Sequence, residues 1–482
     1  MMDKSAGTYC RAKRALVAIT LVSVLVTVSA SACLTSTNNP ASSGGIVLAA
    51  EPTGGSWKPF VLNSSDVPRS IPPPSRDSSQ FNQEVNELKA LQLNRTPAVN
   101  ESIGYWNNGS AVRWNEIARS LVIKNGTSAP MASRVYALLS VAQYDALVSA
   151  WNNKYTYNRS SPHDIDPSIQ PAVQTTSDPA YPSDHAAVAG ASSAVLSYLY
   201  PNETAWLSTQ AAADEESRLA AGVNFRSDIT AGDSLGRTVA LAVIARARND
   251  GSNTPWNGTV PTGPDKWVST TSPPQPPFLP NWGNVTPWLL NSSDLVMPPS
   301  PPVFGSAQFN ASLQEVKQIA NGRTAEQLQI ALFWDNDPPG HWNQIASDLI
   351  QSYHLNELRS SRALALMNTA AMDAGICCWK AKYDYWYPRP IQADPTIKTA
   401  FPTPNFPSYT SGHSDFSSAS GGVLSYIFPN EKSELQAKVQ EASLSRVYAG
   451  IHYRFDCDQG VMDGSKVAQY AIQRGENDGS PP

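Results

Sequence analysis

Residues 382–456 contain three short polar clusters in a fixed order: Lys382-x6-Arg389-Pro390, then Pro407-Ser-Tyr-Thr-Ser-Gly-His413, then Ser445-Arg446-x5-His452-x3-Asp456. Lysine, arginine, hydroxyl and backbone N–H groups are the donors that bind a tetrahedral oxyanion such as phosphate or vanadate. The two histidines add a nucleophile or ligand and a general acid–base. One such cluster alone would be read as surface charge or a hydrogen-bonded core histidine. The three together predict an oxyanion site.

The sequence around these clusters has the periodicity of helices and no competing strand alternation. Residues 361–379 carry apolar side chains at helical spacing without a proline, which predicts a buried helix. Further helices are expected at residues 417–428, 431–449 and 464–473. The Ser411-Gly412-His413 cluster precedes one of them, so its backbone N–H groups are expected at a helix N-terminus, where anions bind. Gly412 has no side chain, which lets the backbone approach the anion closely.

The clusters belong to the second of two similar segments that align without gaps at an offset of 228 residues. Trp114-Asn-Glu-Ile-Ala matches Trp342-Asn-Gln-Ile-Ala, and residues 195–203 match residues 423–431. A repeat of this length predicts a tandem duplication. The expected fold is therefore all-α, with two tandem helical bundles and the active site in the C-terminal bundle.

The two segments differ where the chemistry is expected. The first has Ser161 in place of Arg389, Asp184 in place of Gly412 and Asn224 in place of His452. It thus loses a cation, gains a carboxylate where an anion should bind and loses the second histidine, and the carboxylate should repel the anion. We therefore expect the N-terminal bundle to be a retained scaffold, in which His185 and Arg218 are structural.

The three clusters together resemble the signature of the superfamily of vanadium-dependent haloperoxidases and type 2 phosphatidic-acid phosphatases. The resemblance implies that His452 is the covalent ligand of vanadate in a haloperoxidase, or the nucleophile in a phosphatase, and that His413 is the acid–base. It implies that the equatorial oxygens are held by a set of five residues: Lys382, Arg389, Ser411, Gly412 through its amide, and Arg446. The spacing of His452 and Asp456 further predicts that Asp456 binds the imidazole N–H and fixes its tautomer.

Three features resemble the haloperoxidase branch. Trp379 and Phe406 stand at positions that line the halide side of the vanadate pocket in that branch. Trp379 also fits an aromatic residue of the core, because the first segment has a tryptophan, Trp151, at the equivalent position. Residues 333–337 resemble the family segment whose Asp supports the acid–base His, which indicates Asp337, with Asp335 as the alternative. The soluble two-bundle architecture also matches this branch.

The resemblance thus implies an enzyme that uses vanadate, hydrogen peroxide and halide to form hypohalous acid, which halogenates organic acceptors. A secreted acid phosphatase that acts on phosphate esters through phospho-His452 is the alternative, because both branches share the polar clusters.

The N-terminus predicts export. Basic residues precede the apolar run at residues 15–28 and an Ala30-Ser-Ala32 cleavage site, so residues 1–32 are expected to be a signal peptide, with no later segment apolar enough to span a bilayer. Cys33, directly after that site, also fits a lipid anchor. Eleven Asn-x-Ser/Thr sequons fit a glycoprotein. We expect a secreted, periplasmic or cell-surface protein. Its net charge of -5 argues against nucleic-acid binding.

Composition divides the remainder into four parts: a Ser/Asn/Pro-rich leader or arm (33–95), the N-terminal bundle (96–255), a Pro-rich connector (256–302) and the catalytic bundle (303–482). Cys377, Cys378 and Cys457 lie beyond the signal region. If the polar clusters converge, a disulfide from Cys457 to one of the other two is expected in an oxidising compartment. Three buried thiols are the alternative.

Overall fold

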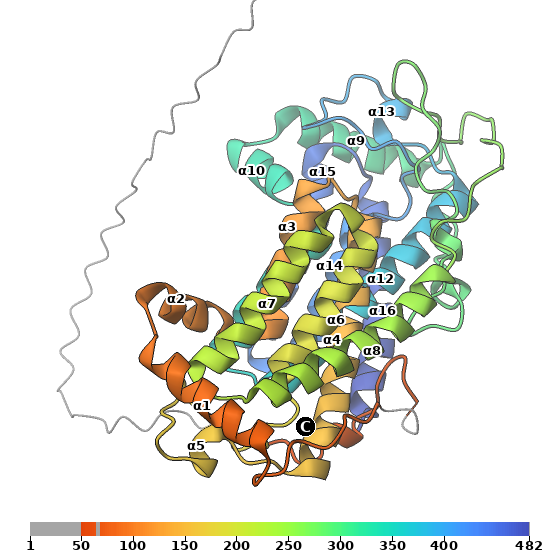
Figure 1. The fold of residues 1–482 in the computed structure, drawn as a ribbon. Coiled ribbons are helices and arrows are strands. Elements are labelled where there is room, and N and C mark those ends of the chain that lie inside the picture. Colours follow the sequence, from red (N-terminus) through yellow and green to blue (C-terminus); the bar gives the residue numbers. More distant parts are fainter. Residues whose placement is uncertain (1–49, 64–67, 482) are drawn as a thin grey trace, which may run out of the picture. The chain divides into compact units, whose positions relative to one another are not determined.

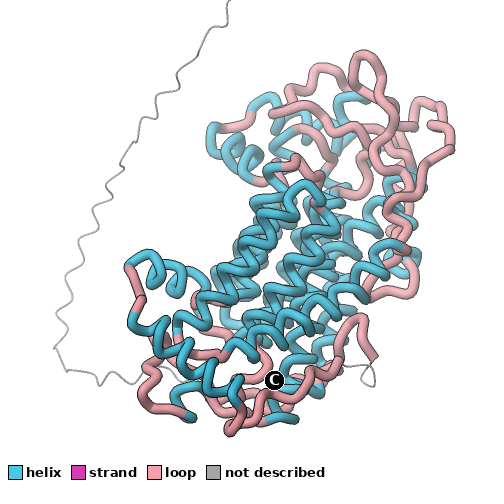
Figure 2. Tube along the Cα trace, viewed as in Figure 1, coloured by secondary structure: helices cyan, strands magenta, loops and turns pink. Residues whose placement is uncertain are grey.

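The structure is a computed structural model that describes residues 50–63 and 68–481. Over these ranges it contains helices and loops and no strand (Figure 2), which confirms the predicted all-α class for the part described. The predicted signal peptide (1–32) and Cys33 lie outside the described residues. Within the described ranges, no helix is both long enough and apolar enough to cross a membrane.

The α-helices form two series, and the members of the second begin 228 residues after those of the first (Figure 1). The first half contains α1 (Ser79–Leu93), α2 (Pro97–Trp106), α3 (Ser110–Lys124), α4 (Ala129–Tyr157), α5 (Pro162–Ile165), α6 (Asp184–Leu199), α7 (Thr204–Ala221) and α8 (Arg226–Arg248). The second half contains α9 (Ala307–Gly322), α10 (Ala325–Phe333), α11 (Pro338–Ser352), α12 (Glu357–Tyr385), α13 (Pro390–Ala393), α14 (Gly412–Ile427), α15 (Lys432–Ala449) and α16 (Arg454–Glu476).

Local sequence signals set many of these helix ends. Ser78 and Ser306 cap α1 and α9, each accepting a hydrogen bond from the backbone N–H three residues later. Helices α7 and α15 end at Gly222 and Gly450, whose φ angles of 73° and 77° favour glycine. The two halves therefore use the same signals at equivalent positions.

The predicted helices are confirmed, with changes at two starts. Helix α12 contains the predicted 361–379 segment, and α15 agrees with the predicted 431–449. Helix α14 begins at Gly412, five residues before the prediction, and α16 begins ten residues early, at Arg454. Both added segments mix polar and apolar residues without a clear helical spacing of the apolar ones, so a search for apolar periodicity does not find them.

The two halves share one hydrophobic core. Helices α4 and α12 are buried over most of their length and pack against each other. At this contact, Asn368 Nδ2 donates to Ser140 Oγ at 2.9 Å, and between α3 and α11 Asn115 Nδ2 donates to Asn343 Oδ1 at 2.7 Å. In each of these pairs the two residues stand 228 apart. Contacts between equivalent positions mark a local twofold relation, so the halves are packed face to face.

The described part of the segment predicted as a leader or arm (33–95) packs against the helices of the first half. Trp57 is only 1% exposed and lies in the shared core, and α1 packs against α7. The Pro-rich connector lies against the second half, as the side-chain contacts of three tyrosines show. These are hydrogen bonds from Tyr385, Tyr387 and Tyr409 to the carbonyls of Pro298, Pro302 and Pro299, at 2.7, 2.8 and 2.8 Å.

Candidate active site

Lys382, near the end of α12, joins the first polar cluster to the second. Its Nζ donates to the carbonyl oxygens of Pro407, Ser408 and Thr410 at 3.0, 2.8 and 2.5 Å. An ammonium group has three N–H donors, so the loop uses all of them. Lys382 therefore fixes this loop and contributes its charge to the site, rather than a free hydrogen-bond donor.

Arg389 joins the first cluster to the third. Its Nη1 lies 2.9 Å from the carbonyl oxygen of Ile451 and 3.0 Å from Nε2 of His452. Its Nε donates to the carbonyl of Phe406 at 2.9 Å. Among the residues that the structure describes, the buried Nη2 of Arg389 has no hydrogen-bond partner. A buried guanidinium donor of this kind requires a partner, and a bound oxyanion would supply one.

The predicted contact between His452 and Asp456 is confirmed. Nδ1 of His452 lies 2.9 Å from Oδ2 of Asp456, which also accepts hydrogen bonds from Ser408 Oγ and from the backbone N–H of Tyr453. A carboxylate accepts a hydrogen bond, so Nδ1 of His452 carries the proton and Nε2 carries the lone pair. Ser408 was not identified from the sequence, although it lies in the same cluster as His413.

The end of α10 and the residues after it contact both Arg446 and His413. Arg446 Nη2 donates to the carbonyl of Ala331 at 2.7 Å, and its Nη1 lies 3.5 Å from Asp335 Oδ1. His413 Nε2 lies 2.7 Å from the carbonyl oxygen of Trp334. A carbonyl can only accept, so Nε2 of His413 carries the proton and Nδ1 is left as a base.

The predicted support of His413 by Asp337 requires correction. Asp337 Oδ2 instead accepts a hydrogen bond of 2.6 Å from the hydroxyl of Tyr136, on α4 of the first half. The backbone at Asp337 turns through a left-handed φ of 44° just before α11, and this turn places the carboxylate toward α4. The alternative, Asp335, pairs with Arg446. The hydrogen-bond partner of His413 is a backbone carbonyl, which no side-chain motif could indicate.

Trp379 and Phe406 form an aromatic wall beside the cations. Their ring centroids lie 5.1 Å apart, and the face of Phe406 lies 4.8 Å from the guanidinium carbon of Arg389. A Cβ atom at Gly412 would lie 3.3 Å from Cζ3 of Trp379. The first turn of α14 is thus closely packed against this wall, and the hydroxyl of Ser411 does not cap the helix. The first amide groups of α14 are therefore available to an anion.

Burial and the surrounding cations shift the pKa values of the groups in the site. Burial, then Arg389 and Lys382, lower the pKa of His452 well below its usual range, and burial and Arg446 do the same for His413. Burial lowers the pKa of Lys382 to about 8 and raises that of Asp456 to about 6. The neighbouring cations disfavour further positive charge, so the site favours a bound anion.

These pKa shifts predict that an oxyanion binds together with a proton. With a pKa of about 8, Lys382 is about half protonated at pH 8. A bound anion should raise this pKa, so the binding of one anion at pH 8 should be accompanied by the uptake of at most about half a proton. Sulfate is a suitable probe because it does not titrate in this range. We expect proton uptake when sulfate binding is measured by calorimetry at pH 8 in two buffers of different ionisation enthalpy. Lys382→Arg should abolish the uptake, and proton release by the wild type would contradict the prediction.

The predicted disulfide is wrong, because all three cysteines are free and buried. Cys378 Sγ lies 3.6 Å from the carbonyl of Thr410, while Cys457 packs in the aromatic cluster with Tyr387 and Tyr453. The backbones of the second and third polar clusters do meet, through the N–H of Ser411 and the carbonyl of Asp456. The sulfur atoms of Cys378 and Cys457 nevertheless pack in different hydrophobic clusters.

Comparison with known proteins agrees with this geometry. Residues 133–251, which lie in the first half, match the PAP2 superfamily. A vanadium chloroperoxidase from Curvularia inaequalis is 26% identical over 30% of this chain, and the match spans 32% of that protein, about a third of its length. A bacterial vanadium-dependent iodoperoxidase structure has a TM-score of 0.61 and 25% identity, covering 75% of this chain and 95% of that one.

A second solved structure, a bacterial vanadium-dependent chloroperoxidase in its apo form, shares the fold, with a TM-score of 0.55 and 15% identity, over 72% of this chain and 93% of that one. The resemblance inferred from the polar clusters is thereby confirmed. The chain has a PAP2 superfamily region and is similar, in sequence and in structure, to the vanadium haloperoxidases.

Proposed function

We propose that the protein is a secreted vanadate-dependent haloperoxidase that oxidises halide with hydrogen peroxide to hypohalous acid, which halogenates organic acceptors. The observation that carries the proposal is the contact of Arg389 with Nε2 of His452, whose Nδ1 is held by Asp456. This arrangement leaves one imidazole lone pair among buried cations, as a ligand for an oxyanion centre requires. The names of the similar proteins support vanadium as the cofactor.

The residues of the second half fit vanadate in the following way. Nε2 of His452 would hold the vanadium, while Arg389 Nη2, Arg446 and the first amides of α14 would hold its oxygens. Bound vanadate would supply a Lewis-acid centre that activates hydrogen peroxide without a change of its own oxidation state. Nδ1 of His413, whose low pKa keeps it neutral, would accept a proton during the reaction. Trp379 and Phe406 would border the halide.

A phosphomonoesterase is the second candidate, because the same groups suit phosphoryl transfer. Nε2 of His452 would attack phosphorus and displace the alcohol, and His413, once the bound anionic ester had brought a proton to its Nδ1, would give that proton to the leaving oxygen. Water would then hydrolyse phospho-His452 to release phosphate. The match of residues 133–251 to the PAP2 superfamily does not separate the two candidates, because both belong to the superfamily that the polar clusters resemble.

We further propose that the chain arose by tandem duplication and that the second half is the catalytic one. The common offset of the helix starts and the contacts between equivalent residues support the duplication. The full set of Lys382, Arg389, Gly412, His413, Arg446 and His452 is present in the second half, whereas the first has Ser161, Asp184 and Asn224 at three of these positions.

A paired assay tests the proposed function. Purified, metal-free protein would be assayed for bromination of a phenolic dye with peroxide, with and without orthovanadate, and for hydrolysis of p-nitrophenyl phosphate. We expect bromination that depends on vanadate, and phosphate hydrolysis only in its absence. Phosphate hydrolysis that vanadate inhibits, without any halogenation, would assign the protein to the phosphatase branch.

A further inference from the structure

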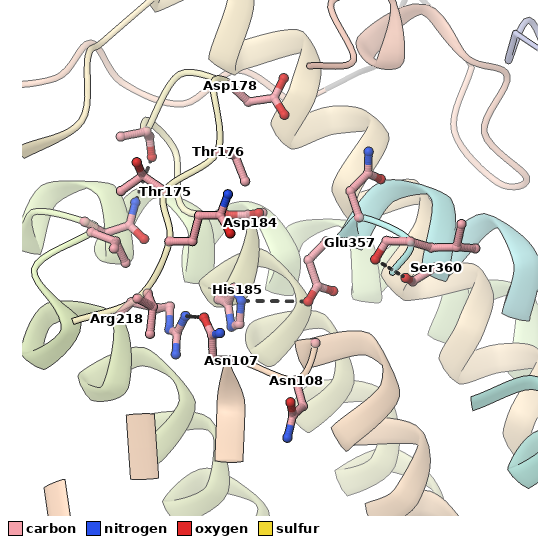
Figure 3. A pocket seen from close by; sticks show the side chains of 18 of the residues that line it. Asn107, Asn108, Thr175, Thr176, Asp178, Asp184, His185, Arg218, Glu357 and Ser360 are labelled. Atoms are coloured by element: carbon pink, nitrogen blue, oxygen red, sulfur yellow. Dashed lines mark hydrogen bonds and ion pairs between the residues drawn. The ribbon is translucent and has the colours of Figure 1, made fainter. Parts of the chain in front are cut away.

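The first half contains a cavity of about 620 Å³ at the place equivalent to the candidate active site (Figure 3). Its lining includes Lys154, His185 and Arg218, the counterparts of Lys382, His413 and Arg446. The N-terminal turn of α12, from the second half, completes the wall through residues such as Glu357. A volume of this size is typical of sites for small organic molecules.

The charge of this cavity is opposite to that of the candidate active site. Three carboxylates line it, those of Asp178, Asp184 and Glu357, against two cations, Lys154 and Arg218. The carboxylate of Asp184 replaces Gly412, and at the positions of Arg389 and His452 the first half has the uncharged Ser161 and Asn224. An oxyanion is therefore excluded by repulsion, and a positively charged group is favoured.

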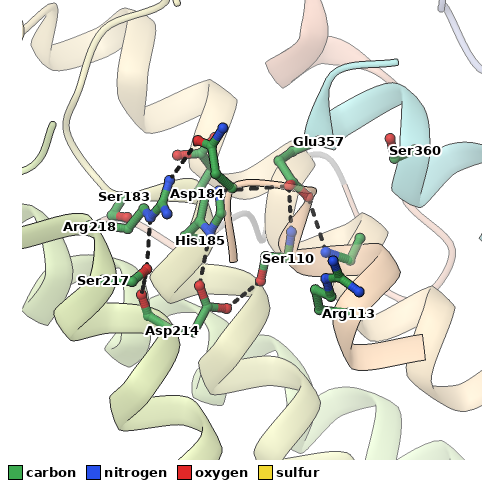
Figure 4. A network of polar contacts seen from close by, with 12 residues as sticks. Ser110, Arg113, Ser183, Asp184, His185, Asp214, Ser217, Arg218, Glu357 and Ser360 are labelled. Carbon is green, nitrogen blue, oxygen red and sulfur yellow. Dashed lines mark hydrogen bonds and ion pairs between the residues drawn. The ribbon is translucent and has the colours of Figure 1, made fainter. Parts of the chain in front are cut away.

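Glu357 brings additional negative charge from the second half to His185. Its Oε1 lies 3.7 Å from Nε2 of His185, while Nδ1 of that ring lies 2.9 Å from Oδ1 of Asp214 (Figure 4). The same carboxylate accepts hydrogen bonds from the N–H groups of Ser110 and Ala111, at 2.6 and 3.1 Å. The position of Glu357 is thus fixed by the start of α3, and the negative wall of the cavity is part of the fold.

Most charged groups of the cavity already have hydrogen-bond partners. Lys154 Nζ donates to the carbonyl of Pro179 at 2.7 Å, and Asp178 accepts from the hydroxyl of Tyr155 at 2.6 Å. Arg218 donates to Ser217 Oγ at 3.0 Å and, at 3.3 Å, to Asn107 Oδ1.

Asp184 is the exception. Among the residues that the structure describes, no other residue donates a hydrogen bond to its carboxylate, and its ion-pair partner, Lys154, is 3.6 Å away. Although burial opposes ionisation, attraction to Lys154 and His185 lowers the pKa of Asp184, so the group is a carboxylate at neutral pH. Figure 3 shows it among the side chains that line the cavity. An ionised acceptor with room for a donor calls for a ligand N–H.

We propose that the first-half cavity binds a small organic cation, with an ammonium group on the carboxylate of Asp184. The uncharged lining suits the body of such a molecule, because it combines apolar walls with side-chain amides and hydroxyls, among them Val112, Trp151, Asn108, Thr175, Thr176 and Ser360. This site is separate from His452 and does not depend on the proposed function of the second half.

Three probes that share one phenol ring and differ in charge test the proposal. Tyramine is a cation, tyrosol is neutral and 4-hydroxyphenylacetate is an anion at pH 7.5. Calorimetry with the full-length protein at low salt should show that tyramine binds at least about tenfold more tightly than either of the others. Asp184→Asn, which preserves the size of the side chain, should weaken the binding of tyramine by about tenfold or more. It should leave the affinity for tyrosol within about twofold of the wild type.

Asp178→Asn is the matched control, because it removes a carboxylate that Tyr155 already binds. This variant should weaken the binding of tyramine by less than about threefold. Equal weakening by both variants would overturn the assignment to Asp184. So would binding of 4-hydroxyphenylacetate as tight as that of tyramine, or no binding of tyramine by the folded wild type.

Asp184→Gly gives a second readout, since it introduces the residue of the second half. This variant should lose the preference for tyramine, because the free carboxylate is gone. If the variant kept that preference while folded, the proposal would fail. The activity found in the paired assay should be unchanged in Asp184→Asn, so that failure of the cation site and failure of the proposed function are separate outcomes.

Discussion

Replacement of His452 by asparagine is expected to lower vanadate-dependent bromination by at least about 10³-fold, because it removes the nitrogen that would hold the vanadium. Asn224 at the equivalent position of the first half shows that this fold accommodates asparagine there, where it donates to the carbonyl of Ala180 at 3.0 Å. The variant should therefore fold. The measurement is the initial rate with bromide and peroxide at saturating vanadate, beside equilibrium dialysis of vanadate.

Asn224→His is the matched control for this variant, since it places a histidine at the same position in the first half. It should leave the rate unchanged, because Ser161 and Asp184 still replace the arginine and the glycine that a second oxyanion site would require. If His452→Asn kept a tenth of the wild-type rate with normal thermal stability, His452 would not be the ligand. The same result in phosphate hydrolysis would also exclude a phospho-His452 mechanism.

Gly412→Asp is expected to weaken sulfate and vanadate binding by about 10²- to 10³-fold and to reduce activity accordingly. The new carboxylate would stand at the first residue of α14, near the cations that we propose bind the anion, as Asp184 stands at the first residue of α6. Its Cβ would also lie 3.3 Å from Cζ3 of Trp379, so a small adjustment of the aromatic wall is required. Calorimetry with sulfate measures the affinity directly.

Gly412→Asn separates charge from size in this experiment. It has the same shape as the aspartate variant without the charge, so we expect it to weaken sulfate binding by about tenfold at most. A loss as large as that of Gly412→Asp would attribute the requirement for glycine to packing against Trp379 instead of to charge. Thermal unfolding of both variants shows whether the bundle remains intact.

The two halves illustrate how a few substitutions alter the chemistry of one framework. The equivalent positions of Lys382, His413 and Arg446 keep their residue types in the first half, whereas Arg389 and His452 have uncharged counterparts. The position that is glycine in the second half, Gly412, is aspartate in the first half, Asp184. This difference alone changes the local charge by one unit and places a hydrogen-bond acceptor where the backbone would otherwise meet an anion. On the two proposals made above, the same framework would bind an anion in the second half and a cation in the first.

The sequence by itself determined the helices, the spacing of the two halves and the residues of the polar site. These features depend on local periodicity, on caps and on motifs of fixed spacing, and each is readable within a short stretch of chain. The contact of His452 with Asp456 belongs to this class, because the two residues are only four apart. The helix starts at Gly412 and Arg454 were missed because their first turns lack the apolar spacing by which helices were predicted.

Only the tertiary structure decided which groups meet across the two halves. Asp337 binds Tyr136 of the first half and not His413, Glu357 of the second half lines the first-half cavity, and Cys457 packs away from Cys378. Each of these outcomes depends on the direction of a side chain at the end of a helix and on the packing of helices far apart in sequence. A change in helix rotation alters such directions without changing any local pattern, so the sequence of each segment alone does not contain them.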